Sequence, residues 1–295
     1  MRATLRVHVR LVVWSCLTLS AAIALAVGPG ATAAAVQTTT PPGGATARYL
    51  GNAAVLVADG STSVAFDPLF RNDFGTYERV PDAIERALFA GAPPFDGLDA
   101  VFVSHHHEDH FSAADVLRLL EVRPGLRLYA PAQAVAGMRA LAPDRLAAVL
   151  DRVTAVALDY GDAPITVQHG ALLIEAVRVP HSGWPARQQQ VENLAFRVTL
   201  GGATTVVHLG DADANDAHFA GDGAFWGRRR THLALPPYWF FLTPAGRQVL
   251  ERRTAATHSI GVHVPAEVPS RPADRAPELR PHELFTEPGD VRTIR

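Results

Sequence analysis

One short segment of the sequence contains four candidate metal ligands, His105, His107, Asp109 and His110. It runs from His105 to His110, with the sequence HHHEDH, between an apolar run at 101–103 and Ser112, a residue typical of a helix N-cap. His105 and His107 are two residues apart, so in extended backbone they point to the same side. Imidazole and carboxylate groups bind Zn²⁺ and similar ions at neutral pH. The segment therefore predicts a metal site, and a solvated loop that happens to be rich in histidine is the weaker interpretation.

Four further motifs follow stretches that are apolar or alternate in polarity. They are Phe66-Asp67-Pro68, Pro180-His181-Ser182-Gly183, His208-Leu209-Gly210-Asp211 and the segment from His258 to His263. Together with the His-x-His-x-Asp-His string at 105–110, and in this order, they resemble the metallo-β-lactamase fold superfamily. The resemblance covers about Arg48 to Pro265, and its first motif is the most specific.

The resemblance implies two divalent metal ions, with zinc expected and manganese or iron as alternatives. One ion would be bound by His105, His107 and His181, the second by Asp109, His110 and His263, and Asp211 would bridge the two. Asp109 would also be catalytic, because its carboxylate can accept a hydrogen bond from the attacking water. Asp67 would orient a ligand side chain, although a turn residue before Pro68 is an equal interpretation.

The activity implied by the resemblance is hydrolysis of an ester, lactone or phosphodiester by a metal-bridging hydroxide. The Asp at position 211 and the absence of a cysteine ligand argue against the cysteine-containing secreted β-lactamases. The motifs look most like the branch that contains ascorbate-6-phosphate lactonases and N-acyl-phosphatidylethanolamine phospholipase D. A non-catalytic metal-binding or recognition module, or a mononuclear iron oxygenase on the same fold, are the alternatives.

The elements that must position these residues alternate between strands and helices. Apolar and alternating runs predict strands at 53–57, 63–66, 100–103, 194–200 and 204–209, and two strands about Gly170 within 165–179. Helices are predicted at 81–90, 113–120 and 131–141. The pattern and the resemblance agree on an α/β fold, an αββα sandwich of two mixed β-sheets with outer helices.

Several other residues near the motifs have weaker assignments. His106 and Glu108 alternate away from the ligand side, and His208 is expected to be a hydrogen-bonded core histidine. The aromatic run 238–241 is expected in the core, with a pocket wall as the alternative. The segment 70–77 lies between strand ends and is a candidate substrate loop, or else an ordinary surface loop.

The N-terminus has the three parts of a secretory signal peptide. Arg2, Arg6 and Arg10 precede an apolar run from Leu11 to Val27, and the small residues at 31–33 follow. We expect a cleaved signal at 1–35, a linker at 36–45, a hydrolase domain at 46–268 and a Pro-rich C-terminal tail at 269–295. The protein would then be secreted or periplasmic, with no stable membrane span after cleavage; an uncleaved anchor is the alternative.

The composition narrows the chemistry further. The chain has 295 residues, 48% of them hydrophobic, and a formal net charge of −2, which gives no electrostatic reason to expect nucleic acid as a partner. A small-molecule substrate is expected, and the sequence leaves the oligomeric state open. All 27 basic residues are arginine and Cys16 is the single cysteine, so Schiff-base lysine chemistry and a disulfide scaffold are excluded.

Overall fold

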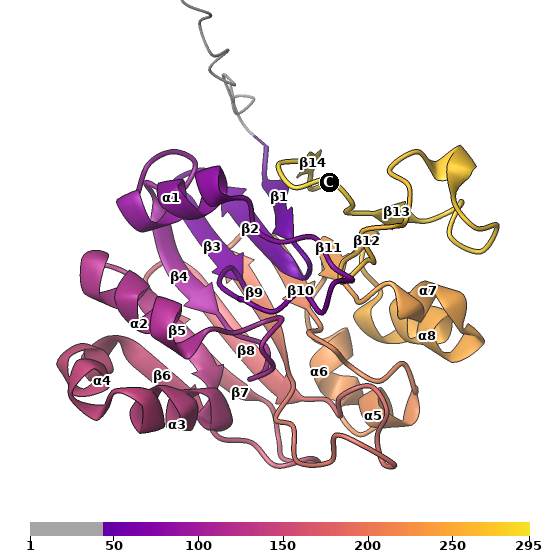
Figure 1. Cartoon of the computed structure of the whole chain (residues 1–295). Coiled ribbons are helices and arrows are strands. Elements are labelled where there is room, and N and C mark those ends of the chain that lie inside the picture. The colour runs from indigo at the N-terminus through magenta and orange to yellow at the C-terminus, as the bar shows by residue number, and fades with distance from the viewer. Residues whose placement is uncertain (1–43) are drawn as a thin grey trace, which may run out of the picture. The chain divides into compact units, whose positions relative to one another are not determined.

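The structure, a computed structural model, describes residues 44–295 (Figure 1). The expected signal peptide and nearly all of the expected linker lie outside these residues. Within the described range, no helix combines the length and the apolar character that crossing a membrane requires.

The first of two β-sheets has seven strands in the order β14-β1-β2-β3-β4-β5-β6. Neighbours from β14 to β3 are antiparallel and those from β3 to β6 are parallel, so the sheet is mixed. Its strands are β1 (Thr46–Gly51), β2 (Ala54–Asp59), β3 (Thr62–Phe66), β4 (Leu98–Phe102), β5 (Arg127–Pro131), β6 (Val153–Val156) and β14 (Val291–Thr293).

The second sheet also has seven strands, in the order β13-β12-β11-β10-β9-β8-β7. Neighbours from β7 to β10 are antiparallel and those from β10 to β13 are parallel. Its strands are β7 (Ile165–His169), β8 (Leu172–Arg178), β9 (Leu194–Leu200), β10 (Thr204–His208), β11 (Leu233–Leu235), β12 (His258–Gly261) and β13 (Glu283–Leu284).

Helices cover the outer face of each sheet, and the inner faces pack on each other through an apolar core that includes Phe66, Phe102 and Phe196 (Figure 1). This arrangement confirms the expected αββα sandwich. Over the first sheet lie α1 (Asp82–Ala90), α2 (Ala113–Val122), α3 (Ala132–Leu141) and α4 (Pro143–Val149). Over the second lie α5 (Ala217–Ala220), α6 (Gly223–Gly227), α7 (Trp239–Leu242) and α8 (Pro244–Val249). Single turns occur at Leu150–Arg152, Leu250–Thr254 and Pro272–Asp274.

The strands and helices predicted from the sequence are present within a few residues of their expected ends. Ser112 begins α2 as expected, because its hydroxyl accepts a hydrogen bond from the Asp115 amide at 3.4 Å. A strand beginning at His258 was expected and is β12, whereas β5, β6, β11, β13 and β14 were not predicted, because they are short or lack a clear alternation.

The C-terminal residues 269–295 differ from the irregular surface tail that their proline content indicated. They contribute β13 to the second sheet and β14 to the first, and Phe285 between them is fully buried with its ring stacked on Tyr49 at 5.3 Å. Strands of two or three residues at sheet edges tolerate neighbouring prolines, because few of their amides must join the ladder. The tail expectation was therefore wrong, and this segment belongs to the folded unit.

Candidate metal centre

The strand directions bring the predicted site residues to one edge of the sandwich. In the first sheet β3 and β4 run parallel, so Asp67 and the segment 105–110 follow the same edge. In the second sheet β8, β10 and β12 run in one direction, because β9 is antiparallel to both its neighbours and β10 to β12 are parallel. His181, Asp211 and His263 follow these three strands. The carboxyl ends of parallel strands are where open sheets bind ligands.

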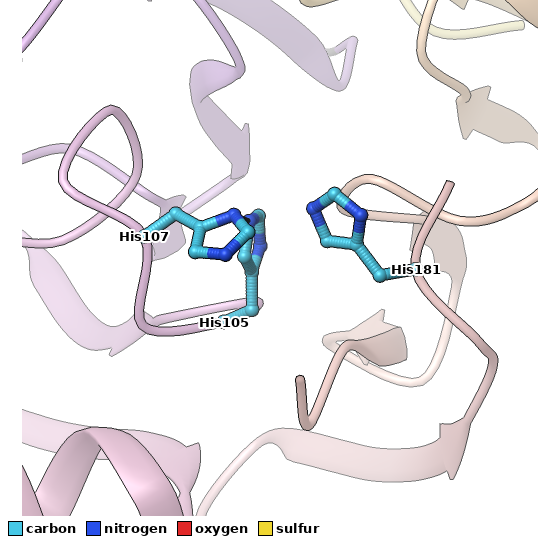
Figure 2. A group of neighbouring side chains, drawn as sticks. All are labelled: His105, His107 and His181. Atoms are coloured by element: carbon cyan, nitrogen blue, oxygen red, sulfur yellow. Dashed lines mark hydrogen bonds between the residues drawn. The ribbon is translucent and has the colours of Figure 1, made fainter. Parts of the chain in front are cut away.

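Three histidines form the first of two groups of possible metal ligands. They are His105, His107 and His181, and one nitrogen from each lies within 4.8 Å of the others. Figure 2 shows His105 and His107 on one stretch of chain, with His181 facing them across a gap. His105 Nε2 lies 3.1 Å from His107 Nδ1, and the His181 ring is 4.9 Å from the His105 ring. Three imidazoles converging on one point are a common zinc ligand set.

The second group joins two carboxylates and two histidines, all four buried. Its members are Asp109, His110, Asp211 and His263, again with one ligand atom each within 4.8 Å of the rest. His263 Nε2 lies 3.1 Å from Asp109 Oδ2 and 3.2 Å from Asp211 Oδ2. The structure thus brings together all seven residues that the sequence assigned to metal binding.

Asp211 lies between the two groups. Its Oδ2 is 3.5 Å from His181 Nε2 and 4.0 Å from His105 Nε2 in the first group. Its Oδ1 is 3.2 Å from His110 Nε2 in the second group. A carboxylate in this position can contact an ion on either side.

The seven side chains fit metal ions because several of their polar atoms are buried without a partner. His110 Nε2, His181 Nε2 and Asp211 Oδ1 are inaccessible to solvent and have no hydrogen bond of good geometry, although Asp211 Oδ1 lies 3.2 Å from His110 Nε2. A buried polar atom without a good hydrogen bond costs about 1–3 kcal/mol, so binding of a cation by these atoms would be favourable. Divalent cations would satisfy all of them, since each is a potential ligand atom.

Hydrogen bonds on the far ring nitrogens hold three of the histidines in place. His105 Nδ1 lies 3.0 Å from Ser104 Oγ, and His181 Nδ1 lies 2.9 Å from the backbone oxygen of Ser182. His110 Nδ1 lies 2.8 Å from Asp67 Oδ2. Such contacts fix which nitrogen faces the metal.

Asp67 therefore contacts a candidate ligand directly, as the orienting interpretation expected. Its carboxylate also accepts hydrogen bonds from the Ser104 amide at 2.7 Å and the Ser104 hydroxyl at 2.6 Å. The residue has φ 44°, a left-handed conformation that is uncommon for aspartate. His263 is also left-handed, with φ 56°. Backbone strain of this kind concentrates at functional sites.

Burial and the surrounding charges divide the histidines into two kinds. Burial lowers the pKa of His105 and brings that of His107 to about 4, so both are neutral and ready to bind a cation at pH 7. Burial acts in the same direction on His110 and His263, but nearby carboxylates, chiefly Asp211, raise the pKa of both overall. Burial opposes the charge of Asp211 in turn, yet His263 and His110 hold its pKa well below the usual range. Without bound cations, the carboxylates therefore favour the protonated forms of His110 and His263.

A cavity of about 560 Å³ opens onto the two groups. The segment 70–77, expected as a candidate substrate loop, contributes Phe74 and Tyr77 to its wall. The Tyr77 ring lies edge-on to His263 at 4.1 Å, and burial together with the charges of Asp211 and Asp109 raises its pKa, so its hydroxyl stays a hydrogen-bond donor. The lining residues are Phe74, Tyr77, His106, His107, Glu108, Asp109, His181, Gln188, Asp211 and His263.

The weaker assignments have mixed outcomes. His208 is a hydrogen-bonded core histidine as expected, with Nε2 2.9 Å from the Ala53 oxygen and Nδ1 accepting from the Gly210 amide. His106 does not point away from the site: it is half-buried and lines the cavity. The aromatic run divides, because Phe240 and Phe241 are buried in the core while Trp239 lies 5.3 Å from His263.

Sequence reasoning used Asn52 only in the family resemblance and did not mention Asn193, although both asparagines support the site. The Asn193 side chain accepts a hydrogen bond from the Asp211 amide at 2.9 Å and donates to the backbone oxygens of Val179 and Leu209. The Asn52 side-chain amide donates a hydrogen bond to the backbone oxygen of Asp109 at 2.8 Å. Both asparagines contact residues far away in the chain, so no local sequence pattern could predict these contacts.

Comparisons with known proteins agree with this geometry. A family model described as "Beta-lactamase superfamily domain" matches residues 62–222, more than half of the chain. No curated protein matches the sequence significantly.

Solved structures share the fold at low identity. A possible metal-dependent hydrolase from Veillonella parvula has 13% identity and a TM-score of 0.58, with 85% of this chain and 100% of that chain covered. Isothiocyanate hydrolase from Delia radicum gut bacteria has 13% identity and a TM-score of 0.52, covering 84% and 98%. Igni18, a metallo hydrolase from Ignicoccus hospitalis, has 16% identity and a TM-score of 0.51, covering 85% and 98%.

Proposed function

The chain belongs to the β-lactamase superfamily, and we propose that it is a hydrolase that uses two divalent metal ions, zinc in the first instance. The observation that carries the proposal is the position of Asp211, whose two carboxylate oxygens face histidines of both ligand groups at 3.2–4.0 Å. A site for a single ion would not need a buried carboxylate between two complete groups.

His105, His107 and His181 would hold one ion, Asp109, His110 and His263 the other, and Asp211 both. Ions bound there would supply hydroxide near neutral pH and polarise the bond to be cleaved. Asp109 is both a proposed ligand and the catalytic residue, because the carboxylate lines the cavity and can accept a hydrogen bond from water. The Tyr77 hydroxyl can donate a hydrogen bond to an oxygen of the substrate.

The bond that is cleaved is proposed to be that of an ester, a lactone or a phosphodiester in a small molecule. The likeness to the branch of ascorbate-6-phosphate lactonases and N-acyl-phosphatidylethanolamine phospholipase D remains a prediction. Among described residues the site holds no basic cluster that would select a phosphate, so the carbonyl substrates are tested first.

Metal analysis and hydrolysis assays on the same preparation test this function. We expect two zinc or manganese ions per chain, hydrolysis of at least one ester, lactone, thioester or phosphodiester, and loss of activity after chelation that returns with the metal. His263→Ala should lose metal, whereas His169→Ala, in β7, controls for adventitious histidine binding and should keep two ions. One iron per chain with dioxygen consumption would instead indicate the oxygenase, and metal without turnover the recognition module.

We also propose that the protein is exported and cleaved. Support comes only from the sequence, where the apolar run Leu11 to Val27 is followed by small residues. Mass spectrometry of the exported protein should find an N-terminus between Ala34 and Val36, and retention of Met1 or Arg2 would contradict cleavage.

A further inference from the structure

Phe74 lines the cavity although both its exposure to solvent and its backbone conformation are unfavourable for phenylalanine. Phe74 is 59% exposed although it is a large apolar residue, and it lines the cavity. Its φ is 51°, a left-handed conformation that costs a bulky residue about 1–2 kcal/mol. Exposure and strain together disfavour phenylalanine here unless the ring has a role.

The loop that carries Phe74 is firmly anchored. Asn72 Oδ1 accepts a hydrogen bond from the Phe74 amide at 2.9 Å, and Asp73 Oδ1 accepts one from the Gly75 amide at 2.8 Å. Asn72 also donates its side-chain amide to Glu108 Oε2 at 3.0 Å. At the other end, the Thr76 oxygen accepts from the Ala266 amide at 2.8 Å. The fold therefore anchors the backbone that carries this ring at the cavity.

The charge of the cavity wall is acidic. Glu108, Asp109 and Asp211 line the cavity, and no arginine is among its described lining residues. The nearby Arg71 is engaged elsewhere, with its guanidinium 2.8 Å from Glu85 and 2.6 Å from Asp115. Two divalent ions would more than offset the charges of Asp109 and Asp211, so repulsion of an anionic end on the substituent would come from Glu108, an exposed carboxylate of the lining that belongs to neither ligand group.

We propose that the site selects an uncharged acyl compound whose apolar substituent packs on Phe74, so that Phe74 is the specificity-determining residue. This inference rests on the proposed function for the location of the metal ions. It narrows the substrate class from esters, lactones and phosphodiesters to uncharged carbonyl compounds with an apolar group.

Binding of hydroxamates to the zinc-loaded full chain tests the inference without turnover. Acetohydroxamate, octanohydroxamate and suberic acid monohydroxamate share one metal-binding group and differ in the chain that would meet Phe74. We expect octanohydroxamate to bind about tenfold or more tightly than acetohydroxamate, because it buries several methylene groups. The suberic compound, which has the same length but a terminal carboxylate, should lose about that gain.

Variants locate the effect. Phe74→Ala should reduce the octanohydroxamate advantage to about twofold and leave acetohydroxamate binding unchanged, and Phe74→Leu should keep part of it. Leu150→Ala removes an exposed apolar side chain far along the chain, and it should keep the full advantage. Equal affinity for the two alkyl compounds, tighter binding of the carboxylate, or an equal loss of all three in Phe74→Ala would overturn the inference.

A parallel assay separates this inference from the proposed function. p-Nitrophenyl octanoate and bis(p-nitrophenyl) phosphate release the same chromophore from an uncharged ester and an anionic diester. We expect turnover of the ester with a kcat/KM that falls about tenfold in Phe74→Ala. If no substrate is turned over but the hydroxamate preference persists, the proposed hydrolase function is refuted and the binding preference stands. If the phosphodiester is turned over in preference to the ester, the proposed selectivity for uncharged acyl compounds is refuted and the hydrolase function stands.

Discussion

At the scale of single residues, the centre depends on a carboxylate whose charge is shared. Asp211 is buried among histidines of both groups, and its amide is held by Asn193. A neutral amide in its place would keep the shape and the backbone contact. It would lack the negative charge that offsets part of the mutual repulsion between two bound ions.

Asp211→Asn should therefore bind about one ion per chain instead of two, and its hydrolysis rate should fall roughly a thousandfold or more. The metal-free variant should still fold, although its free energy of unfolding should fall because His110 and His263 lose the charge that they face. Metal stoichiometry and the rate on the responding substrate are measured on the same sample.

The matched control is Asp213→Asn, two residues further on. The Asp213 carboxylate accepts a hydrogen bond from the Asn215 amide at 3.1 Å, in a turn, and the residue belongs to neither ligand group. This variant should keep two ions and near-normal rate. Two ions and a normal rate in Asp211→Asn would refute the bridging role.

Protons compete with the metal at one group more than at the other. The pKa values of His110 and His263 are raised, so both carry protons in the metal-free protein at pH values where free imidazole has lost them, and those protons must leave on metal binding. The pKa values of His105 and His107 are lowered, so they have none to release near pH 7.

Zinc affinity at the carboxylate-containing group should rise as the pH is raised from 6 to 8, by about tenfold per pH unit for each displaced proton. Affinity at the three-histidine group should change less. Competition with a chromophoric chelator at several pH values, and calorimetry in buffers of different ionisation enthalpy, measure both. A pH-independent affinity at both groups would contradict the proton balance inferred here.

At the scale of elements, the turns after the strands aim the ligands. Gly210 lies between the end of β10 and Asp211, and its φ is +55°. A Cβ at this position would lie 2.3 Å from Asn193 Oδ1 and 2.7 Å from Ser104 Cβ. The two sheets approach too closely here for any side chain, and Asn193 is the residue that holds the Asp211 amide.

Gly210→Ala should destabilise the protein by roughly 2–5 kcal/mol, because a left-handed alanine and a steric overlap add together. It should also weaken metal binding by displacing Asn193. Gly202→Ala isolates the first cost, since that glycine has φ +75° but nothing within 4 Å of its would-be Cβ. Urea unfolding of the metal-free proteins gives both values, and equal losses in the two variants would show that the overlap is relieved at no cost.

At the scale of the whole described unit, the C-terminal segment links the two sheets. Its strands β13 and β14 extend the second and the first sheet, and Phe285 between them fills the core against Tyr49. The segment also covers strands that would otherwise be sheet edges, which are prone to aggregate.

Phe285→Ala should therefore cost about 3–5 kcal/mol of unfolding free energy, as expected for a large aromatic removed from a core. Val291→Ala in β14 is the comparison within the same segment; its side chain is 40% exposed, and it should cost less than about 1 kcal/mol. Thermal and urea unfolding measure the difference. A near-neutral Phe285→Ala would show that the segment is an appendage after all.

The sequence by itself predicted the strands and helices that have strong periodicity and the cap at Ser112, and its resemblance to a known superfamily implied the seven residues that the structure brings into two groups. These carry local or ordered signals: a hydrophobic period, a dense HHHEDH string and a series of motifs that follow strands. It could not determine the C-terminal strands, because two or three residues are too few for a pattern and prolines pointed the other way.

Only the tertiary structure decided which contacts support the candidate centre and where a cavity opens onto it. Asn193 reaches Asp211 and Asn52 reaches Asp109 over separations in the chain that no local pattern records, whereas Phe74 lies in the segment 70–77 that the sequence offered as a candidate substrate loop. Their roles arise because parallel strands from two sheets end at one edge, and that closeness is a property of packing. Residue types specify what chemistry a chain can perform, whereas contacts between distant segments specify where it takes place.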